Sequence, residues 1–179
     1  MLAHIHVILS DEYPELHSIP NLLAARLNTL DLQFNTDSHV VKIQYLKENE
    51  TLDATSINAD PFTAAIVCLA SNTQQITHCS QAWLHDTVSV VRCTITDSGE
   101  SDVAQYKKAM QKLKVYGPTY VLTYDRKSHD ATLTELEKYF TPKDLHKNSL
   151  NIVILRLLQE IELQLLMPFY SPFYLNGNA

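Results

Sequence analysis

Side chains that could bind a cation or a small polar ligand follow several expected strands of this chain. Hydroxyl, amide and carboxylate groups coordinate hard cations and hydrogen-bond polar ligands. The candidate positions, called here the strand-end residues, are Ser10, Asp11, Glu12, Ser71, Asn72, Thr73, Thr94 and Thr96. Asp11 and Glu12 are the candidates for a magnesium ion, and the others for a cofactor such as a flavin. The competing interpretation is that all of them are ordinary caps and turn formers at loop starts.

Two histidines and three cysteines are the other residues whose side chains could bind a metal or take part in catalysis. His4 and His6 share one face of an expected strand and could bind a metal together with a third ligand. Spacing assigns no third ligand, so a pair that is satisfied within the fold is the competing interpretation. No C-x-x-C motif is present, and Cys79 follows His78 without facing it on a helix. Two of the cysteines, Cys68 and Cys93, are expected in the core.

Composition excludes several classes of function. Only 3 of the 179 residues are glycine, so the glycine-rich loops that cradle phosphates are absent. Lys and Arg total 14 against 20 Asp and Glu, a formal net charge of −6, which is opposite to the charge that nucleic-acid backbones attract. Nucleic acid is therefore not an expected partner. Because no G-x-S-x-G or H-E-x-x-H signature is present either, the sequence favours a function other than catalysis.

The strand-end residues need a sheet to position them, and the hydrophobic pattern predicts one. Strands are expected at 4–9, 39–46, 64–69, 87–95 and 119–124, helices at 20–30, 71–84, 101–117 and 132–140, and a long polar loop at 47–61. Strands that alternate with helices at this spacing predict parallel neighbours joined by crossovers. We therefore expect an α/β fold with a doubly wound, mostly parallel five-stranded sheet, a flavodoxin-like three-layer sandwich. Its ligand crevice would lie beyond the carboxyl ends of the strands.

The C-terminal part of the chain is its most apolar segment. Residues 150–167 carry a helical stripe wider than one sheet face would cover, although 151–155 could equally form a strand. We expect residues 1–145 to form the α/β domain, and 146–179 to be an apolar helix and aromatic tail that packs on it or forms an oligomer interface. Arg156, Glu160 and Glu162 argue against a membrane span, so a membrane is not an expected partner.

Residues 7–16 resemble the opening of a response-regulator receiver domain, in which an acidic pair after the first strand binds magnesium. Asp11 and Glu12 match that pair, and 88–124 is similar to the fourth strand, following helix and fifth strand of the family. Two features depart from the pattern, because no aspartate follows the third strand and Tyr124–Asp125 replaces the family's Lys-Pro pair. The resemblance, over roughly residues 2–140, implies a receiver-like domain that works through contacts and is not phosphorylated in the family's way.

We accordingly expect a non-enzymatic regulatory or protein-interaction domain that forms a homo-oligomer through its C-terminal segment. The alternative is a small-molecule, flavin or nucleotide-binding protein, or an enzyme, that uses the crevice at the strand ends. A third possibility, an acidic protein that neutralises a basic partner, follows from the net charge. An odd number of cysteines and the lack of a signal-peptide pattern in the first residues predict a cytoplasmic location.

Overall fold

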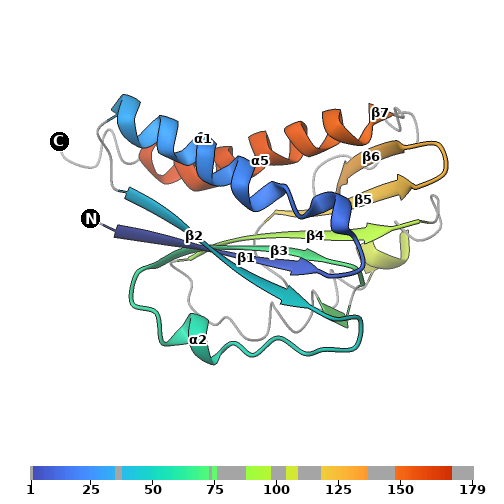
Figure 1. Ribbon diagram of the computed structural model, residues 1–179, viewed down its shortest axis with the longest axis horizontal. Coiled ribbons are helices and arrows are strands. Elements are labelled where there is room, and N and C mark those ends of the chain that lie inside the picture. Colours follow the sequence, from blue (N-terminus) through green and yellow to red (C-terminus); the bar gives the residue numbers. More distant parts are fainter. Residues whose placement is uncertain are drawn as a thin grey trace.

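A mixed sheet forms the centre of the protein in the computed structural model, with helices on both faces (Figure 1). The structure describes residues 2–34, 38–72, 74–75, 88–97, 104–108, 118–136 and 148–170. Its elements are β1 (Leu2–Ser10), η1 (Pro14–Leu16), α1 (Ile19–Phe34), β2 (Ser38–Leu46), α2 (Thr55–Asn58), β3 (Thr63–Ala70), β4 (Ser89–Thr96), β5 (Thr119–Asp125), β6 (Asp130–Glu135), β7 (Asn148–Ser149) and α5 (Leu150–Tyr170). The α/β class predicted from the sequence is confirmed.

Within the described residues the sheet has seven strands in the order β2-β1-β3-β4-β5-β6-β7. The first five in that order run parallel, so their carboxyl ends lie at one edge. The chain passes from β1 to β2 on one side and returns to β3 on the other, which places the change of direction between β1 and β3. That edge is where an open parallel sheet normally holds its ligand.

The expectation of a mostly parallel, flavodoxin-like sheet of five strands is wrong beyond β5. A helix was expected at 132–140, but β6 pairs antiparallel with β5 and β7 pairs antiparallel with β6. The connection from β5 to β6 is the turn 126–129, which is far too short for the crossover that a parallel neighbour requires. Asp125 accepts hydrogen bonds from two groups of this turn, and His129 adopts a φ of 56° in it. Local turn chemistry therefore overrides the helical pattern that followed.

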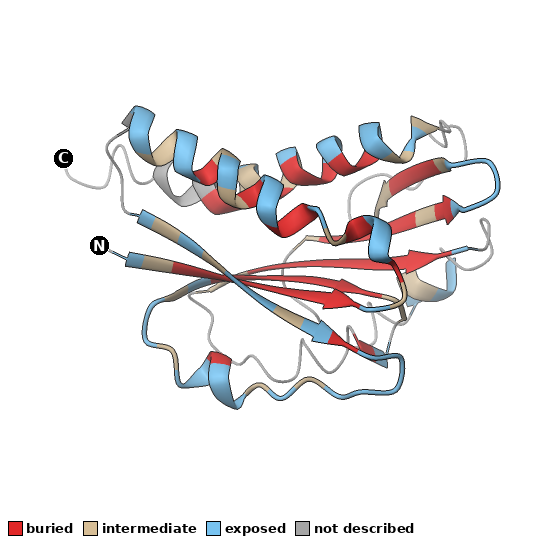
Figure 2. Cartoon of the chain, in the orientation of Figure 1, coloured by how far each residue is buried: buried red, intermediate tan, exposed pale blue. Residues whose placement is uncertain are grey.

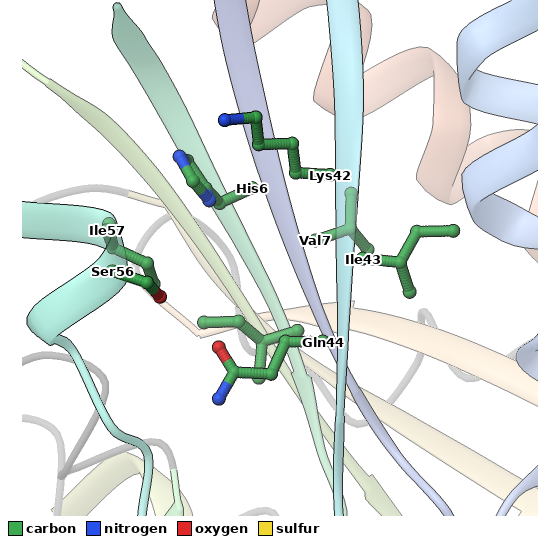
Figure 3. A pocket seen from close by; sticks show the side chains of 8 residues that line it. His6, Val7, Lys42, Ile43, Gln44, Ser56 and Ile57 are labelled. Atoms are coloured by element: carbon green, nitrogen blue, oxygen red, sulfur yellow. The ribbon is translucent and has the colours of Figure 1, made fainter. Parts of the chain in front are cut away.

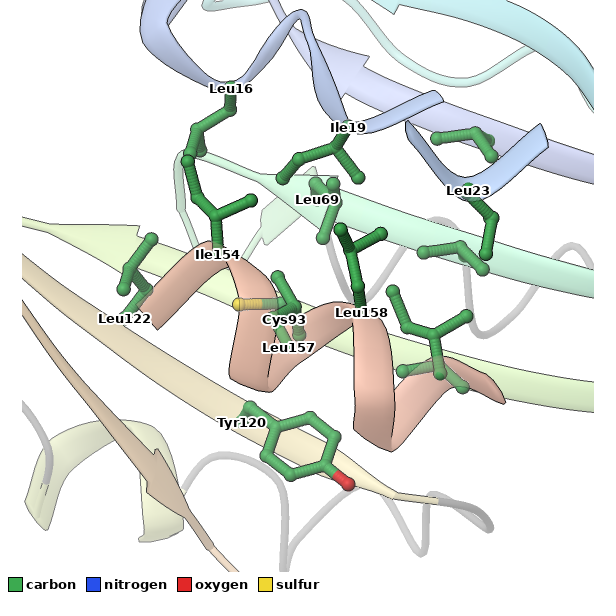
Figure 4. Close-up of a cluster of buried hydrophobic side chains, with 14 of the residues drawn as sticks. Leu16, Ile19, Leu23, Leu69, Cys93, Tyr120, Leu122, Ile154, Leu157 and Leu158 are labelled. Atoms are coloured by element: carbon green, nitrogen blue, oxygen red, sulfur yellow. The ribbon is translucent and has the colours of Figure 1, made fainter. Parts of the chain in front are cut away.

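Helices α1 and α5 lie side by side over one face of the sheet (Figures 1 and 2). They enclose the larger core, part of which Figure 4 shows, and each large aliphatic side chain buried there contributes about 1.5–3 kcal/mol. The buried helix residues are Ile19, Leu23 and Leu27 of α1 and Val153, Ile154, Leu157, Leu158, Ile161 and Leu165 of α5. Residues 151–155 are helical, so the alternative of a sixth strand there is not adopted. Arg26 and Glu162 form a bidentate ion pair that joins the two helices.

The opposite face of the sheet carries α2, which lies within the segment 47–61 that was expected to be loop throughout. Every second residue of β1 points to this side, because side chains alternate along a strand. Ile8 of β1, Ile57 of α2 and Cys68 of β3 belong to a second, smaller core cluster there. Cys68 and Cys93 are buried, as expected, and neither forms a disulfide; burial raises the pKa of the Cys93 thiol to about 12.

Several predictions lie wholly or partly outside the described residues. These are the helix expected at 71–84 apart from 74–75, the helix expected at 101–117 apart from the helical turn at 104–108, the side chain of Thr73, and the aromatic tail after residue 170. Among the helices that the structure does describe, none has the length and apolar character needed to cross a membrane.

Candidate functional site

Ser71 and Asn72, which follow β3, make hydrogen bonds within the protein. The side-chain oxygen of Asn72 accepts the backbone N–H of Gln75 at 2.9 Å, and the Ser71 hydroxyl donates to the Gln75 carboxamide oxygen at 3.1 Å. The Gln75 amide then donates to the carbonyl of Lys47 at 2.9 Å. These bonds tie the loop after β3 to the loop after β2. This local use of Ser71 and Asn72 agrees with the competing interpretation that the strand-end residues are ordinary caps and turn formers. A role of these residues in cofactor binding stays a prediction.

The remaining strand-end residues separate into a buried and an exposed group. Ser10, Thr94 and Thr96 are between 1% and 7% exposed, so these residues lie inside the protein and not at its surface. Asp11 is exposed and Glu12 partly so, and these two carboxylates face solvent at the end of β1. Among the described residues no three His, Cys, Asp or Glu side chains are arranged to hold a metal ion. A magnesium site would therefore have to be completed by water, and it stays a prediction.

Arg126, in the turn after β5, contacts the loop after β1 at the carboxyl edge of the sheet. The guanidinium of Arg126 lies 4.6 Å from the centre of the Tyr13 ring, pairs with Glu15 at 3.3 Å and donates to the Glu12 carbonyl. Burial, with the nearby charge of Asp97, raises the pKa of Tyr13 to about 12, which keeps the phenol neutral at pH 7. The contacts of Arg126 thus cover part of the edge where the crevice was expected.

A second polar group lies on the α2 side of the sheet, and it is the strongest candidate site. We call it the Asp60 cluster, and it comprises His4 and His6 of β1, Lys42 of β2, Asp60, and Thr63 of β3. One oxygen of Asp60, Oδ2, accepts from His4 Nδ1 at 2.6 Å, His6 Nε2 at 3.0 Å and Lys42 Nζ at 3.0 Å. The same nitrogen of His6 lies 3.1 Å from the Thr63 hydroxyl oxygen. Two strands, β1 and β2, therefore donate to one carboxylate, and Thr63 of β3 joins the cluster through His6.

Strand register brings these residues together. His6 is paired with Lys42 across β1 and β2, and His4 is paired with Thr63 across β1 and β3. Asp60 precedes β3 and its second oxygen accepts the Phe62 backbone N–H at 3.0 Å, an Asx turn that aims the carboxylate back at β1. The sequence predicted the shared face of His4 and His6 but missed Asp60. A separation of 54 to 56 residues leaves no spacing signal that could have revealed it.

The Asp60 carboxylate is ionised although its side chain is only 6% exposed. Burial opposes the charged form, but hydrogen bonds from His4, Lys42, the Phe62 amide and His6 together outweigh it and hold the pKa of Asp60 well below its ordinary value of 3.8. Burial also lowers the pKa of His6, and here the attraction of Asp60 compensates only in part. The His6 ring is therefore neutral at pH 7, with one nitrogen protonated and one free to accept.

The hydrogen-bond network assigns the tautomer of His6. The Thr63 hydroxyl has its proton directed at the backbone carbonyls of Ile57 and Asp60, at 3.3 and 3.1 Å, so toward His6 it can only accept. The Asp60 carboxylate likewise only accepts. Nε2 of His6 must then carry the hydrogen, and Nδ1 carries the lone pair. Within the described part of the chain, no hydrogen bond engages that Nδ1.

A pocket of about 220 Å³ opens beside the Asp60 cluster, between β1, β2 and α2 (Figure 3). Polar side chains of His6, Lys42, Gln44 and Ser56 line it together with Val7, Ile8, Ile43 and Ile57. Figure 3 shows the His6 imidazole between the Lys42 ammonium on one side and the Gln44 and Ser56 side chains on the other. The pocket therefore combines a cation, a neutral imidazole, an amide and a hydroxyl above an apolar floor.

The apolar stripe of α5 divides between the core and the surface. Most of it packs against the sheet, but Ile152, Leu155 and Leu163 are 56%, 50% and 57% exposed. At about 100° per residue these three lie within roughly 80° of one another around the helix axis. We call them the outer α5 surface. The predicted excess of apolar residues over what the sheet covers is thus present, but it is smaller than the sequence suggested.

Comparison of the chain with protein-family models, with curated proteins and with solved structures finds no match. The resemblance to receiver domains therefore stays an expectation from the sequence.

Proposed function

We propose that the protein is a non-enzymatic regulatory or protein-interaction domain that self-associates through the outer α5 surface. The observation that supports this proposal is the exposure of three large aliphatic side chains on one side of α5, the face turned away from the sheet. Exposed apolar side chains that gather on one face are more typical of an interface than single exposed ones. A receiver-like regulatory role, exercised through contacts, is part of the same proposal.

The residues around the outer α5 surface suit an interface between two copies. Gln159 lies within the same arc of the helix, and Arg156 and Glu160 lie beside it, so polar and apolar side chains would alternate across the interface. Two α5 helices that pack across a two-fold axis would bring Ile152 and Leu155 of one copy near Leu163 of the other. Only three side chains from each copy become buried, so a weak, concentration-dependent dimer is expected.

The Leu163→Glu variant tests this proposal. It introduces a charge opposite Ile152 and Leu155 of the other copy, so we expect the dissociation constant of the dimer to rise by at least about tenfold, with the fold unchanged. Sedimentation equilibrium over a wide range of protein concentration measures it. Leu32→Glu, at a leucine of α1 that is 86% exposed, is the matched control and should dimerise like the wild type. A wild type that remains monomeric at the highest concentration, or equal effects of the two variants, would refute the proposal.

Ligand binding at the strand ends is the alternative proposal, and Asp11 and Glu12 are the residues that support it. If they hold magnesium, the ion should raise the melting temperature of the wild type more than that of Asp11→Ala. Equal responses in a thermal-shift titration would remove Asp11 from any metal role. For the flavin version, we expect the purified protein to show flavin absorbance. A protein that is colourless, and that is again colourless after incubation with flavin and removal of the unbound flavin, contradicts this version.

A hollow of about 170 Å³ between the loops after β2 and β3 bears on that alternative. Asn72, one of the strand-end residues, lines it together with Glu48 and Glu50. Two carboxylates repel the phosphate of a flavin or a nucleotide, so this hollow suits a cation or an uncharged polar group better. The electrostatics of this hollow therefore count against the flavin and nucleotide versions of the alternative at Asn72, whereas the magnesium version, at Asp11 and Glu12, does not depend on it.

A further inference from the structure

We propose that the pocket beside the Asp60 cluster binds a small hydroxycarboxylate, whose hydroxyl donates to Nδ1 of His6 and whose carboxylate accepts from the ammonium of Lys42. This inference is independent of the proposed self-association, because the pocket lies on the α2 face of the sheet and the outer α5 surface belongs to the opposite layer.

His6 supplies the acceptor. Its Nε2–H is committed to Asp60 and Thr63, and no described residue satisfies Nδ1. Although the side chain is only 10% exposed, its Nδ1 remains accessible to solvent, so a water molecule or a ligand can donate a hydrogen bond to it. A ligand that donates an O–H would satisfy this atom. The fixed tautomer therefore selects for a ligand with a hydrogen-bond donor.

Lys42 supplies the positive charge. An ammonium has three N–H donors, and in the described structure one of them is directed at Asp60, at 3.0 Å. The side chain is 46% exposed, so its other donors are accessible from the pocket and from solvent. Gln44 and Ser56 add an amide and a hydroxyl on the opposite side of the pocket (Figure 3). The Lys42 ammonium suits a carboxylate better than an uncharged oxygen, because only the carboxylate gains a charge-assisted bond.

The volume limits the size of the ligand. About 220 Å³ corresponds to roughly seven water molecules at the liquid volume of about 30 Å³ each. Pockets for larger organic ligands span about 300–1,000 Å³. Ile8 and Ile57, both buried, form an apolar floor that favours a short carbon skeleton over a bare inorganic anion. A compact hydroxycarboxylate fits the size, the floor and the two polar contacts together.

Titration of the full-length protein with glycolate, followed by NMR, tests the proposal. Acetate, which lacks the hydroxyl, and ethylene glycol, which lacks the carboxylate, are the matched probes. We expect glycolate to shift the His6 imidazole nitrogen signals to saturation at millimolar concentrations, and each of the other two probes to bind at least about tenfold more weakly. Nitrogen shifts also report whether His6 holds the Nε2–H tautomer.

Two variants assign the contacts. In His6→Gln the amide nitrogen replaces Nε2 and keeps its donation to Asp60 but removes the Nδ1 acceptor, so the preference for glycolate over acetate should disappear. For Lys42→Met we expect at least about tenfold weaker binding of both carboxylates, whereas the control Lys127→Met, in the exposed turn after β5, should bind like the wild type. In the variants, backbone amide shifts of the pocket residues follow the titration.

The outcomes that overturn the proposal are specific. No shift in the wild type up to about 100 mM glycolate, a concentration at which even a weak site would be occupied, would leave the Asp60 cluster as a structural anchor only. Equal affinity for acetate and glycolate would remove His6 from recognition, and equal binding by Lys42→Met and Lys127→Met would remove Lys42. If His6→Gln does not fold, the comparison of the three probes with the wild type still decides the role of the hydroxyl.

Discussion

Replacement of Leu158 by glutamate is expected to unfold the protein. Leu158 is fully buried and points from α5 into the cluster that also holds Leu23 and Leu69 (Figure 4). Truncation of such a leucine to alanine alone costs about 2–5 kcal/mol, and a buried carboxylate without a partner costs several more. The sum approaches the whole stability of a typical domain, about 5–15 kcal/mol. Urea denaturation followed by circular dichroism measures the loss.

The same substitution on the other side of the helix is the natural control. Leu163→Glu places an identical charge five residues further along α5, at a side chain that is 57% exposed. Its free energy of unfolding should stay within about 0.5 kcal/mol of the wild-type value, as for most surface changes. A folded Leu158→Glu protein with near-native stability would show that α5 does not pack on the sheet as described. From sequence alone Leu158 could have faced a second copy, and its burial decides that it faces the sheet.

Replacement of Asp60 by asparagine is expected to cost about 2–4 kcal/mol of stability at pH 7. The variant keeps the size of the side chain but loses the charge that accepts from His4, His6 and Lys42 at 2.6–3.0 Å. It also turns an amide N–H₂ toward groups that are themselves donors. Asp53→Asn is the control, because this exposed aspartate accepts the Thr55 backbone N–H in an Asx turn that asparagine can form equally well. Similar stabilities for the two variants would contradict the role of Asp60 as the hub of the cluster.

The pH dependence of that difference has a definite sign. The pKa of Asp60 is lower in the folded protein than its ordinary value of 3.8, so the stability that ionised Asp60 provides is fully present above that value. It is lost as the pH falls below 3.8 toward the folded pKa. The difference in unfolding free energy between the wild type and Asp60→Asn should therefore shrink between about pH 5 and pH 2. A difference that stays constant down to the acid limit would show that Asp60 contributes through packing and not through its charge.

Local patterns predicted the central strands well. Residues 64–69 are a continuous apolar run, and they form the middle of β3, which is covered on both faces as such a run requires. The same kind of reasoning failed at 132–135, the start of the helix expected at 132–140, where a helical pattern lies next to a tight turn and the chain forms β6. Over so few residues, the pairing that the turn imposes with β5 is stronger than the intrinsic preference of the segment.

Local patterns predicted only part of the candidate site. The two-residue period of a strand placed His4 and His6 on one face, and the structure agrees. Their common partner comes from a separate part of the chain, and it is the pairing of β1 with β2 and β3 that brings Lys42 and Asp60 beside them. The strand-end residues were identified by their position after strands. In the structure several of them are buried, and Ser71 and Asn72 form hydrogen bonds with Gln75.

By itself, the sequence determined the α/β class, the positions of the central strands, the apolar C-terminal helix and the shared face of the two histidines. These properties follow from side-chain period and apolar content within one segment, which neighbouring residues alone decide. Only the tertiary structure decided that the sheet is mixed, that most of the α5 stripe is internal, and that Asp60 joins His4, His6 and Lys42 beside a pocket. Each of these depends on which distant segments pair, and pairing is set by the free energy of the whole fold.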